Sequence, residues 1–187
     1  MRSVPGRQPS PRSLGRSRPR VSLRLLGGFE ARLVPGGPIP LPKRKSQALL
    51  AYLAVGPSDN QLRDTLTALL WADVSREQAR NSLRQTLFVL RHALAPAAPE
   101  LIRADGDVVV VDRGAMDIDV VTFERLARAE SPEALEQAAT LYGGDLLAGL
   151  RIDEPSFEDW LAPRREQLRA LALGVFQQLL DHMEGPA

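Results

Sequence analysis

Ser-Arg-Glu-Gln-Ala-Arg-Asn-Ser-Leu-Arg-Gln-Thr-Leu-Phe-Val-Leu-Arg-His-Ala-Leu, residues 75–94, is the stretch that decides the fold. Ser75 is followed three residues later by Gln78, which is a capping box and predicts the start of a helix. Apolar residues then recur at helical spacing and predict one buried stripe. These residues are Ala79, Leu83, Leu87, Leu90 and Leu94.

The rest of this helix surface carries side chains that can recognise nucleic acid. It presents Arg80, Asn81, Arg84, Gln85, Phe88, Arg91 and His92, with no acid after Glu77. Arg bonds guanine edges or phosphate, and Asn or Gln bonds adenine. We therefore interpret the segment as a DNA-recognition helix. An ordinary packed helix with a solvated polar face is the alternative.

Two shorter helices are predicted before it, over about 44–55 and 60–71, with a short link at 72–74. Two helices joined by a short turn, the second longer and basic, are typical of a helix-turn-helix. Lys43, Arg44 and Lys45 lie at the start of the first helix, where the helix dipole disfavours cations. Phosphate would relieve that repulsion, as solvent also can, so Lys43 and Lys45 become candidate DNA contacts.

Strand patterns flank the helices. Alternating residues over 21–26 and 29–34, and a short segment at 39–41, predict a small antiparallel meander. After the helices, Asp105-Gly106 separates two apolar runs and predicts a hairpin, in the position of the wing of a winged helix. Arg103 on this hairpin is a candidate contact to a phosphate or a minor groove, or a plain surface residue.

Residues from Met116 onward are predicted to be all-helical. Asp119 caps a helix over 120–129, and Ser131-Pro132 opens the next helix. A brief helical piece at 157–161 and a long helix from Pro163 to about His182 follow. Antiparallel helix pairs of this kind pack as the start of an α-solenoid, so we expect a helical module similar to tetratricopeptide (TPR) repeats.

The charge of the 187 residues changes at the boundaries between the N-terminal tail, the helix-turn-helix region and the helical module. Residues 1–20 carry six basic residues and no acid; residues 21–115 have a net charge of +3, and residues 116–187 a net charge of −8. A basic front suggests a polyanion as partner, although chance segregation would produce the same division. We expect a disordered basic tail over 1–20, a winged-helix domain over 21–115 and a helical module over 116–187.

No enzymatic constellation is present in the sequence. There is no Cys, and the histidines are His92 and His182, with no His-x-x-x-His pair, no phosphate-binding Gly-rich loop and no Gly-x-Ser-x-Gly elbow. No apolar run approaches the roughly 20 residues that span a bilayer. We predict no catalysis, no cofactor, no metal site and no membrane partner.

The order of these motifs resembles a known family. Residues 21–115 resemble the DNA-binding domain of OmpR/PhoB-type winged-helix regulators, as in the Streptomyces antibiotic regulatory proteins (SARPs), and residues 117–187 resemble the first part of the bacterial transcriptional activation domain. The first match is Arg24-Leu25-Leu26-Gly27, Pro42-Lys43, Ala48-Leu49-Leu50-Ala51, Leu70-Trp71, Ala79-Arg80-Asn81-Ser82-Leu83-Arg84 and Leu90-Arg91-His92-Ala93-Leu94. The second is Asp117, Phe123, Leu141-Tyr142-Gly143-Gly144-Asp145-Leu146-Leu147, Trp160 and Arg164–Leu168.

The resemblance implies a cytoplasmic, nucleoid-associated bacterial transcriptional regulator that binds double-stranded DNA. It places the 75–94 helix in the major groove, with Asn81, Arg84, Gln85 and Arg91 facing DNA, and the hairpin on the adjacent backbone or minor groove. It also implies a homodimer through the helical module and contact with RNA polymerase. Because the activation domain normally continues past one long helix, we expect a fragment or a shortened protein.

A second hypothesis stays open. Many relatives have Arg where this chain has Val89, a small polar residue where it has Phe88, and Gly-Tyr in the wing where it has Val108-Val109. These departures, with the modest charge of residues 21–115, favour a scaffold or signalling module that binds no DNA, at the N-terminus of a larger multidomain protein.

Overall fold

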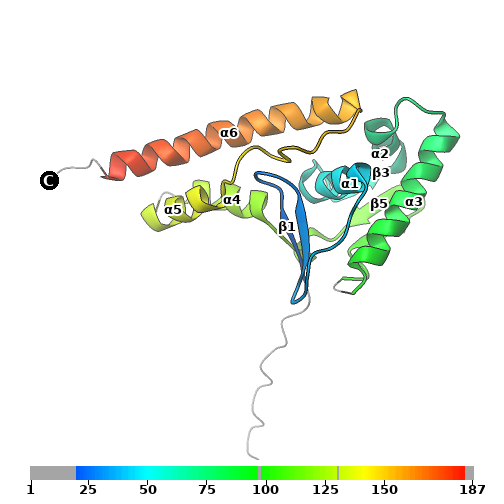
Figure 1. Cartoon of the computed structure of the whole chain (residues 1–187), viewed down its shortest axis with the longest axis horizontal. Helices are drawn as coiled ribbons and strands as arrows, with labels where there is room; N and C mark the ends of the chain where they lie inside the picture. The colour runs from blue at the N-terminus through cyan, green and yellow to red at the C-terminus, as the bar shows by residue number, and fades with distance from the viewer. Residues whose placement is uncertain (1–19, 97, 130, 184–187) are drawn as a thin grey trace, which may run out of the picture.

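The computed structural model describes residues 20–96, 98–129 and 131–183, which form an α+β fold. Figure 1 shows α3 at one end of the molecule, and α5 with the last turns of α6 at the other. The elements are β1 (Arg20–Arg24), β2 (Glu30–Val34), α1 (Arg44–Val55), β3 (Asn60–Leu62), α2 (Arg63–Leu70), α3 (Arg76–Leu94), β4 (Ile102–Asp105), β5 (Val108–Val111), a 3-10 turn (Arg113–Ala115), β6 (Met116–Ile118), α4 (Asp119–Ala127), α5 (Pro132–Leu141) and α6 (Pro155–Met183).

The first sheet differs from the expected meander. β1 and β2 pair antiparallel as predicted, but the third strand is β6, which runs parallel to β1. The segment expected as a third strand makes only an isolated bridge between Arg32 and Pro38. Pro38, Pro40 and Pro42 have no N–H to donate to a ladder, so this segment cannot extend the sheet.

The second sheet has the order β3-β5-β4 and contains the expected hairpin. Asp105 pairs with Val108, so the turn residues are Gly106 and Asp107, and Gly106 has a φ of 55° that favours glycine. The prediction of a helix beginning at Asn60 was wrong, because residues 60–62 pair with β5 before α2 begins. Pairing with β5, which is distant in sequence, makes residues 60–62 a strand and not the first turn of a helix.

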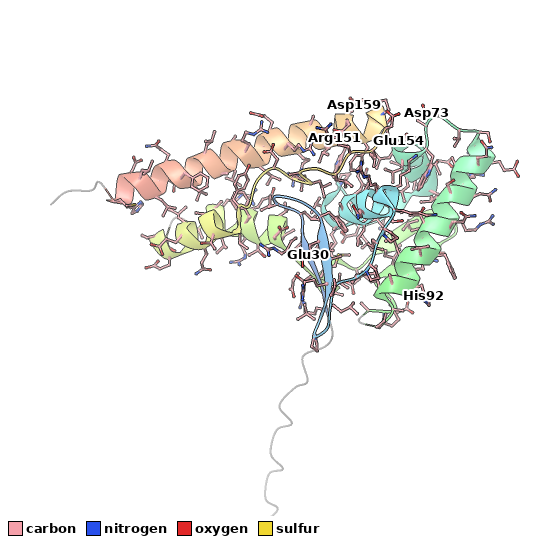
Figure 2. The ribbon with its side chains drawn as sticks, viewed as in Figure 1. Glu30, Asp73, His92, Arg151, Glu154 and Asp159 are labelled. Atoms are coloured by element: carbon pink, nitrogen blue, oxygen red, sulfur yellow. The ribbon has the colours of Figure 1, made fainter. Side chains whose placement is uncertain are left out.

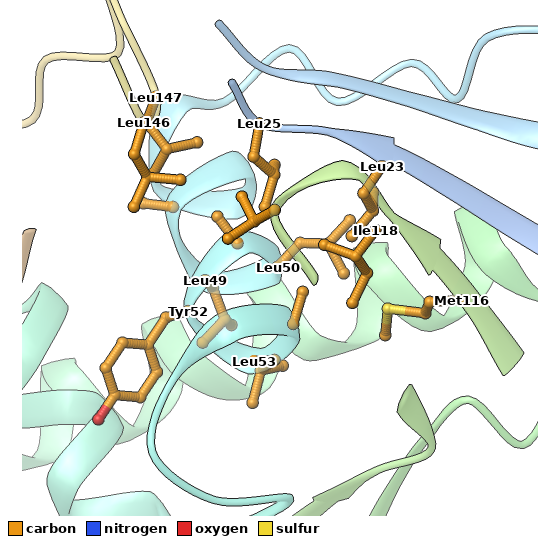
Figure 3. Packing of buried hydrophobic residues seen from close by; sticks show 14 of the residues in the cluster. Leu23, Leu25, Leu49, Leu50, Tyr52, Leu53, Met116, Ile118, Leu146 and Leu147 are labelled. Carbon is orange, nitrogen blue, oxygen red and sulfur yellow. The ribbon is translucent and has the colours of Figure 1, made fainter. Parts of the chain in front are cut away.

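One continuous core joins the two predicted domains. Leu49, Leu50 and Leu53 of α1 are fully buried. Figure 3 shows them beside apolar residues of β1 and β6 and beside Leu146 and Leu147, from the predicted helical module. Each buried leucine contributes roughly 1.5–3 kcal/mol to stability. The helical module and the N-terminal part therefore share their hydrophobic core.

The helical part contains α4, α5 and α6. Ser131 caps α5 by accepting from the Ala134 amide at 3.2 Å, as predicted. The expected break before Pro163 was wrong, since α6 runs through it as one helix of 29 residues. Leu161 and Leu168 are buried on either side of Pro163, so packing holds the helix where proline removes one hydrogen bond.

Two further expectations concern the ends of β1. The predicted basic tail lies outside the described residues except for Arg20, which begins β1 and pairs with Asp117 at 3.0 Å. Asp119 was expected to cap α4, but it lies within the first turn and accepts hydrogen bonds from the Leu25 and Leu26 amides.

Within the described ranges, no helix is long and apolar enough to cross a membrane.

Candidate nucleic-acid interface

The predicted recognition helix is α3; its buried stripe is the one expected, and its exposed face is as expected except at Arg91. The Ser75 hydroxyl accepts from the Gln78 amide and the Gln78 side chain accepts from the Ser75 amide, each at 3.3 Å, so the capping box is confirmed. The five apolar residues of the stripe are at most 4% exposed. Because this stripe packs inward, the opposite face points to solvent.

The exposed face carries Asn81, Arg84, Gln85 and Phe88. The Arg84 guanidinium donates to the Asn81 side-chain oxygen, so the two groups hold one another on the surface. Phe88 is 70% exposed, and its ring stacks on His92 with centroids 6.4 Å apart. An exposed phenylalanine suits contact with a thymine methyl group, and the polar groups suit base edges.

Arg80 is also exposed on α3, but it has an acidic partner within the chain. Asp64, in the first turn of α2, pairs with Arg76 at 2.7 Å and with Arg80 at 3.0 Å. The hydrogen bonds from Arg76 and Arg80 lower the pKa of Asp64. The Asp64 carboxylate weakens the positive potential of the exposed face of α3, an effect that the sequence of α3 alone does not reveal.

Replacement of Asp64 tests this effect. We expect Asp64→Asn to strengthen non-specific duplex binding severalfold at low salt, because the variant releases Arg76 and Arg80 toward phosphate. Fluorescence anisotropy with a duplex of random sequence measures the change. Glu133→Gln, which removes an exposed acid on α5 far from α3, is the control for total charge. Equal effects of the two substitutions would contradict a local role for Asp64.

Arg103 lies on the β4–β5 hairpin, and Arg91 of α3 contacts this hairpin. Arg91 is partly buried, and its Nε donates to the Ile102 carbonyl at 2.9 Å. Arg91 thus ties α3 to β4 instead of pointing outward as expected. Arg103 is exposed on β4, where it pairs in register with Val110. Of these two candidates, the structure leaves Arg103 accessible to a ligand.

Lys43 and Lys45 differ in exposure and in their partners. Lys43 is exposed and is the N-cap residue of α1. Lys45 pairs with Glu154 at 2.5 Å and lies over the Trp71 ring, 5.6 Å from its centroid. Glu154 is only 3% exposed, and Figure 2 shows it near the start of α6. Lys45 therefore has an ion-pair partner within the chain, and its contact with DNA stays a prediction.

A cavity of about 860 Å³ lies along one flank of α3. Its walls come from the start of α1, from α3 between Ser82 and Val89, and from residues 151–153. Arg151 and Ser46, which line it, were not among the predicted site residues. Neither residue belongs to a sequence motif, and residue 151 comes to lie beside α1 only through the tertiary fold.

No group of metal-binding side chains occurs among residues 20–96, 98–129 and 131–183.

Comparison with known proteins gives a fold likeness. No protein family model and no curated protein matches this sequence. The chain is similar to the structure of Mycobacterium tuberculosis EmbR in complex with a low affinity phosphopeptide, with a TM-score of 0.62 and 21% identity. The alignment covers 82% of this chain and 43% of EmbR, so this chain spans less than half of that protein. At this identity the likeness shows a shared fold.

Proposed function

We propose that the chain is a sequence-specific DNA-binding transcriptional regulator of the SARP type. In this proposal α3 lies in the major groove, and the β4–β5 hairpin contacts the adjacent backbone or minor groove. The observation that carries it is the outward face of α3, where Asn81, Arg84 and Gln85 are exposed together. The fold likeness to EmbR supports the architecture of such a regulator.

The position of α3 supports this docking. The helix has 19 residues, so it is about 28 Å long. It forms one end of the molecule, with the other helices behind it (Figure 1). A helix of this kind fits a major groove that is roughly 12 Å wide, with its polar residues against base edges. Such a regulator acts in the bacterial cytoplasm, at the nucleoid.

The helical module is proposed to mediate protein contacts, including homodimerisation and contact with RNA polymerase. One face of α6 exposes Leu173, Phe176, Leu180 and Met183 at spacings of three, four and three residues. This spacing is that of a coiled-coil seam. The buried residues Leu168, Ala172 and Val175 lie on the adjacent side of α6, so the exposed stripe is apolar surface left over for a partner helix.

Substitution within this stripe tests the dimer. Leu180 is 52% exposed, so Leu180→Asp costs the monomer little and places a charge in the proposed seam. We expect the self-association constant of the chain to fall at least tenfold, measured by sedimentation equilibrium. Gln178→Asp, on the same helix but outside the stripe, is the control. A monomeric wild-type chain would contradict homodimerisation through α6.

A scaffold that binds no DNA is the second candidate, and specific contacts favour it. Asp64 holds Arg80, and Arg91 is committed to the wing, so fewer cations face outward than the sequence suggested. For a scaffold, we expect no salt-sensitive binding to duplex DNA, and any residual binding should not depend on the exposed face of α3.

The experiment that separates the candidates is Arg84→Ala in the full chain. Arg84 is exposed, so the substitution leaves the core intact, and we expect loss of about 1–3 kcal/mol of base discrimination. The measurement is the affinity for a selected duplex and for single-base variants of it at several salt concentrations. Arg125→Ala, on an exposed position of α4, is the control. Salt-independent binding, or equal affinity for all duplexes, would favour the scaffold.

A further inference from the structure

The cavity on the flank of α3 has the size and the lining of a small-molecule site. It has a volume of about 860 Å³ and lies between the start of α1, the middle of α3 and the segment before α6. Most of its lining surface is apolar. Ligand pockets in proteins measure roughly 300–1,000 Å³ and are lined mainly by apolar groups. A small molecule with an apolar body therefore fits this cavity.

Four apolar side chains from three parts of the chain line the cavity. They are Trp71 at the end of α2, Phe88 and Val89 of α3, and Ile152 before α6. Phe88 is 70% exposed and Val89 is 39% exposed, so both side chains contact water in the chain alone. A ligand that covered them would remove apolar surface from water, which favours binding. The exposed Phe88 ring also offers a stacking partner to an aromatic ligand.

Cations surround these apolar side chains and outnumber the acids. The charged residues of the described lining are Lys43, Arg44, Lys45, Arg84, Arg151 and the acid Asp153. Lys45 pairs with Glu154. The other four cations make no ion pair with any residue that the structure describes. The lining therefore has a net positive charge, which favours a ligand with an acidic group.

The two predicted domains both contribute to this cavity. Arg151 belongs to the segment that leads into α6 (Figure 2). Its carbonyl accepts a hydrogen bond of 3.2 Å from the Arg44 guanidinium, which ties the segment to α1. A ligand in the cavity contacts both α3 and this segment, so it can bridge the predicted DNA-binding domain and the helical module.

We infer that this cavity binds a small molecule with an aromatic body and one acidic group. The body lies against Phe88, Val89 and Ile152, and the acidic group faces Arg84 and Arg151. Arg84 and Phe88 also belong to the exposed face of α3, so the compound and a major groove compete for the same side chains. The compound is thus a regulator of DNA binding. This regulatory role rests on the proposed function, whereas the binding site does not.

The binding arm of the test uses anilinonaphthalene sulfonate, a fluorescent compound with an aromatic body and one sulfonate group. Fluorescence titration of the full chain without DNA gives its affinity. Phe88→Ala should weaken binding about tenfold, because the phenyl group supplies much of the apolar contact. Arg151→Ala should weaken it about threefold, as expected for an exposed charge pair.

The control for this arm is Leu180→Ala, which shortens an exposed apolar side chain on α6 and should leave the affinity unchanged. Phe88 and Arg151 are both exposed, so their substitution leaves the core intact. If neither Phe88→Ala nor Arg151→Ala changed the affinity, the site would be overturned.

The neutral compound N-phenylnaphthylamine has the same aromatic body without the sulfonate, and it tests the acidic group. Phe88→Ala should weaken the binding of both compounds, whereas Arg151→Ala should weaken only that of the sulfonate. Equal effects of Arg151→Ala on the two compounds would overturn an acidic ligand.

An acidic amphipathic peptide, with Glu and Leu at helical spacing, tests a protein segment as the occupant. We expect its binding to be unaffected by Phe88→Ala. If the peptide bound in a manner that depended on Phe88 and Arg151 while neither aromatic compound did, a protein partner would replace the small molecule.

The DNA arm uses the full chain and a selected duplex. At about ten times its dissociation constant, the sulfonate should weaken duplex binding about tenfold relative to chloride at equal ionic strength, as for competition at one site. Duplex binding that the bound sulfonate leaves unchanged would overturn the regulatory role. If no duplex binds but the Phe88 and Arg151 effects remain, the site stands and the proposed function fails. If Arg84→Ala changes sequence preference while no variant affects the sulfonate, the site fails and the proposed function stands.

Discussion

Lys45→Met is expected to lower the free energy of unfolding by about 3 kcal/mol. Glu154 would lose the ammonium group that lies 2.5 Å from its carboxylate, and would keep the Ala72 amide at 3.2 Å as a donor. Glu154 is 3% exposed, so its charge would remain buried without a counter-ion. Since 38% of the Lys45 side chain is exposed, the loss lies at the lower end for buried pairs. Urea denaturation, followed by circular dichroism, measures it.

A double variant separates the ion pair from other effects of the substitution. Lys45→Met combined with Glu154→Gln removes both charges and should recover most of the loss. Arg32→Met breaks the exposed pair between Arg32 and Glu30 and should cost less than about 1 kcal/mol. If Lys45→Met costs no more than Arg32→Met, the buried pair does not hold α1 to the start of α6.

Asp119→Ala is expected to destabilise the fold by about 3 kcal/mol or more. The buried Asp119 carboxylate accepts from the amides of Leu25 at 2.8 Å, Leu26 at 2.9 Å and Val120 at 2.7 Å. Each buried donor left without a partner costs roughly 1–3 kcal/mol. Asp117→Ala, at an exposed position two residues earlier, is the control and should cost less than about 1 kcal/mol. Equal losses would contradict a specific role for Asp119.

Because of the buried Asp119 carboxylate, we expect the stability of the fold to depend on pH. Burial raises the pKa of Asp119 above its ordinary value, despite the opposing effect of the amide hydrogen bonds. In the window just above the ordinary pKa of aspartic acid, about 4, the folded chain therefore binds more protons than the unfolded chain. The contribution of Asp119 to stability should fall as pH rises through this window. Asp119→Asn should remove that contribution, and denaturation at a series of pH values measures it.

The pattern of α3 was predictable because its signals are local. Ser75 and Gln78 lie three residues apart, and the apolar stripe repeats within one helix, so the sequence alone predicts which face packs inward. The outward placement of Asn81, Arg84 and Gln85 follows from the same periodicity. The hairpin around Gly106 was predictable for a similar reason, since its turn residues adjoin the strands that they connect.

Features that depend on distant pairing were not predictable. β6 directly follows the predicted domain boundary. Its three residues have no strand pattern in the sequence, and they form a strand because they pair with β1. The partners of the candidate cations are also remote in sequence. Lys45 and Glu154 are 109 residues apart, and Arg80 and Asp64 are 16 apart. Periodicity identifies an exposed face, but not which of its charges meet an internal partner.

The most direct measurement of the central claim is crosslinking from α3 to DNA. The chain has no cysteine, so Gln85→Cys introduces a single thiol in the exposed face of α3, to which a photoreactive group can be attached. Glu133→Cys places the same group on exposed α5, at the far end of the molecule (Figure 1). Position 85 should crosslink to bases of a bound duplex, and position 133 should not. Equal or absent crosslinking from position 85 would contradict a recognition helix in the major groove.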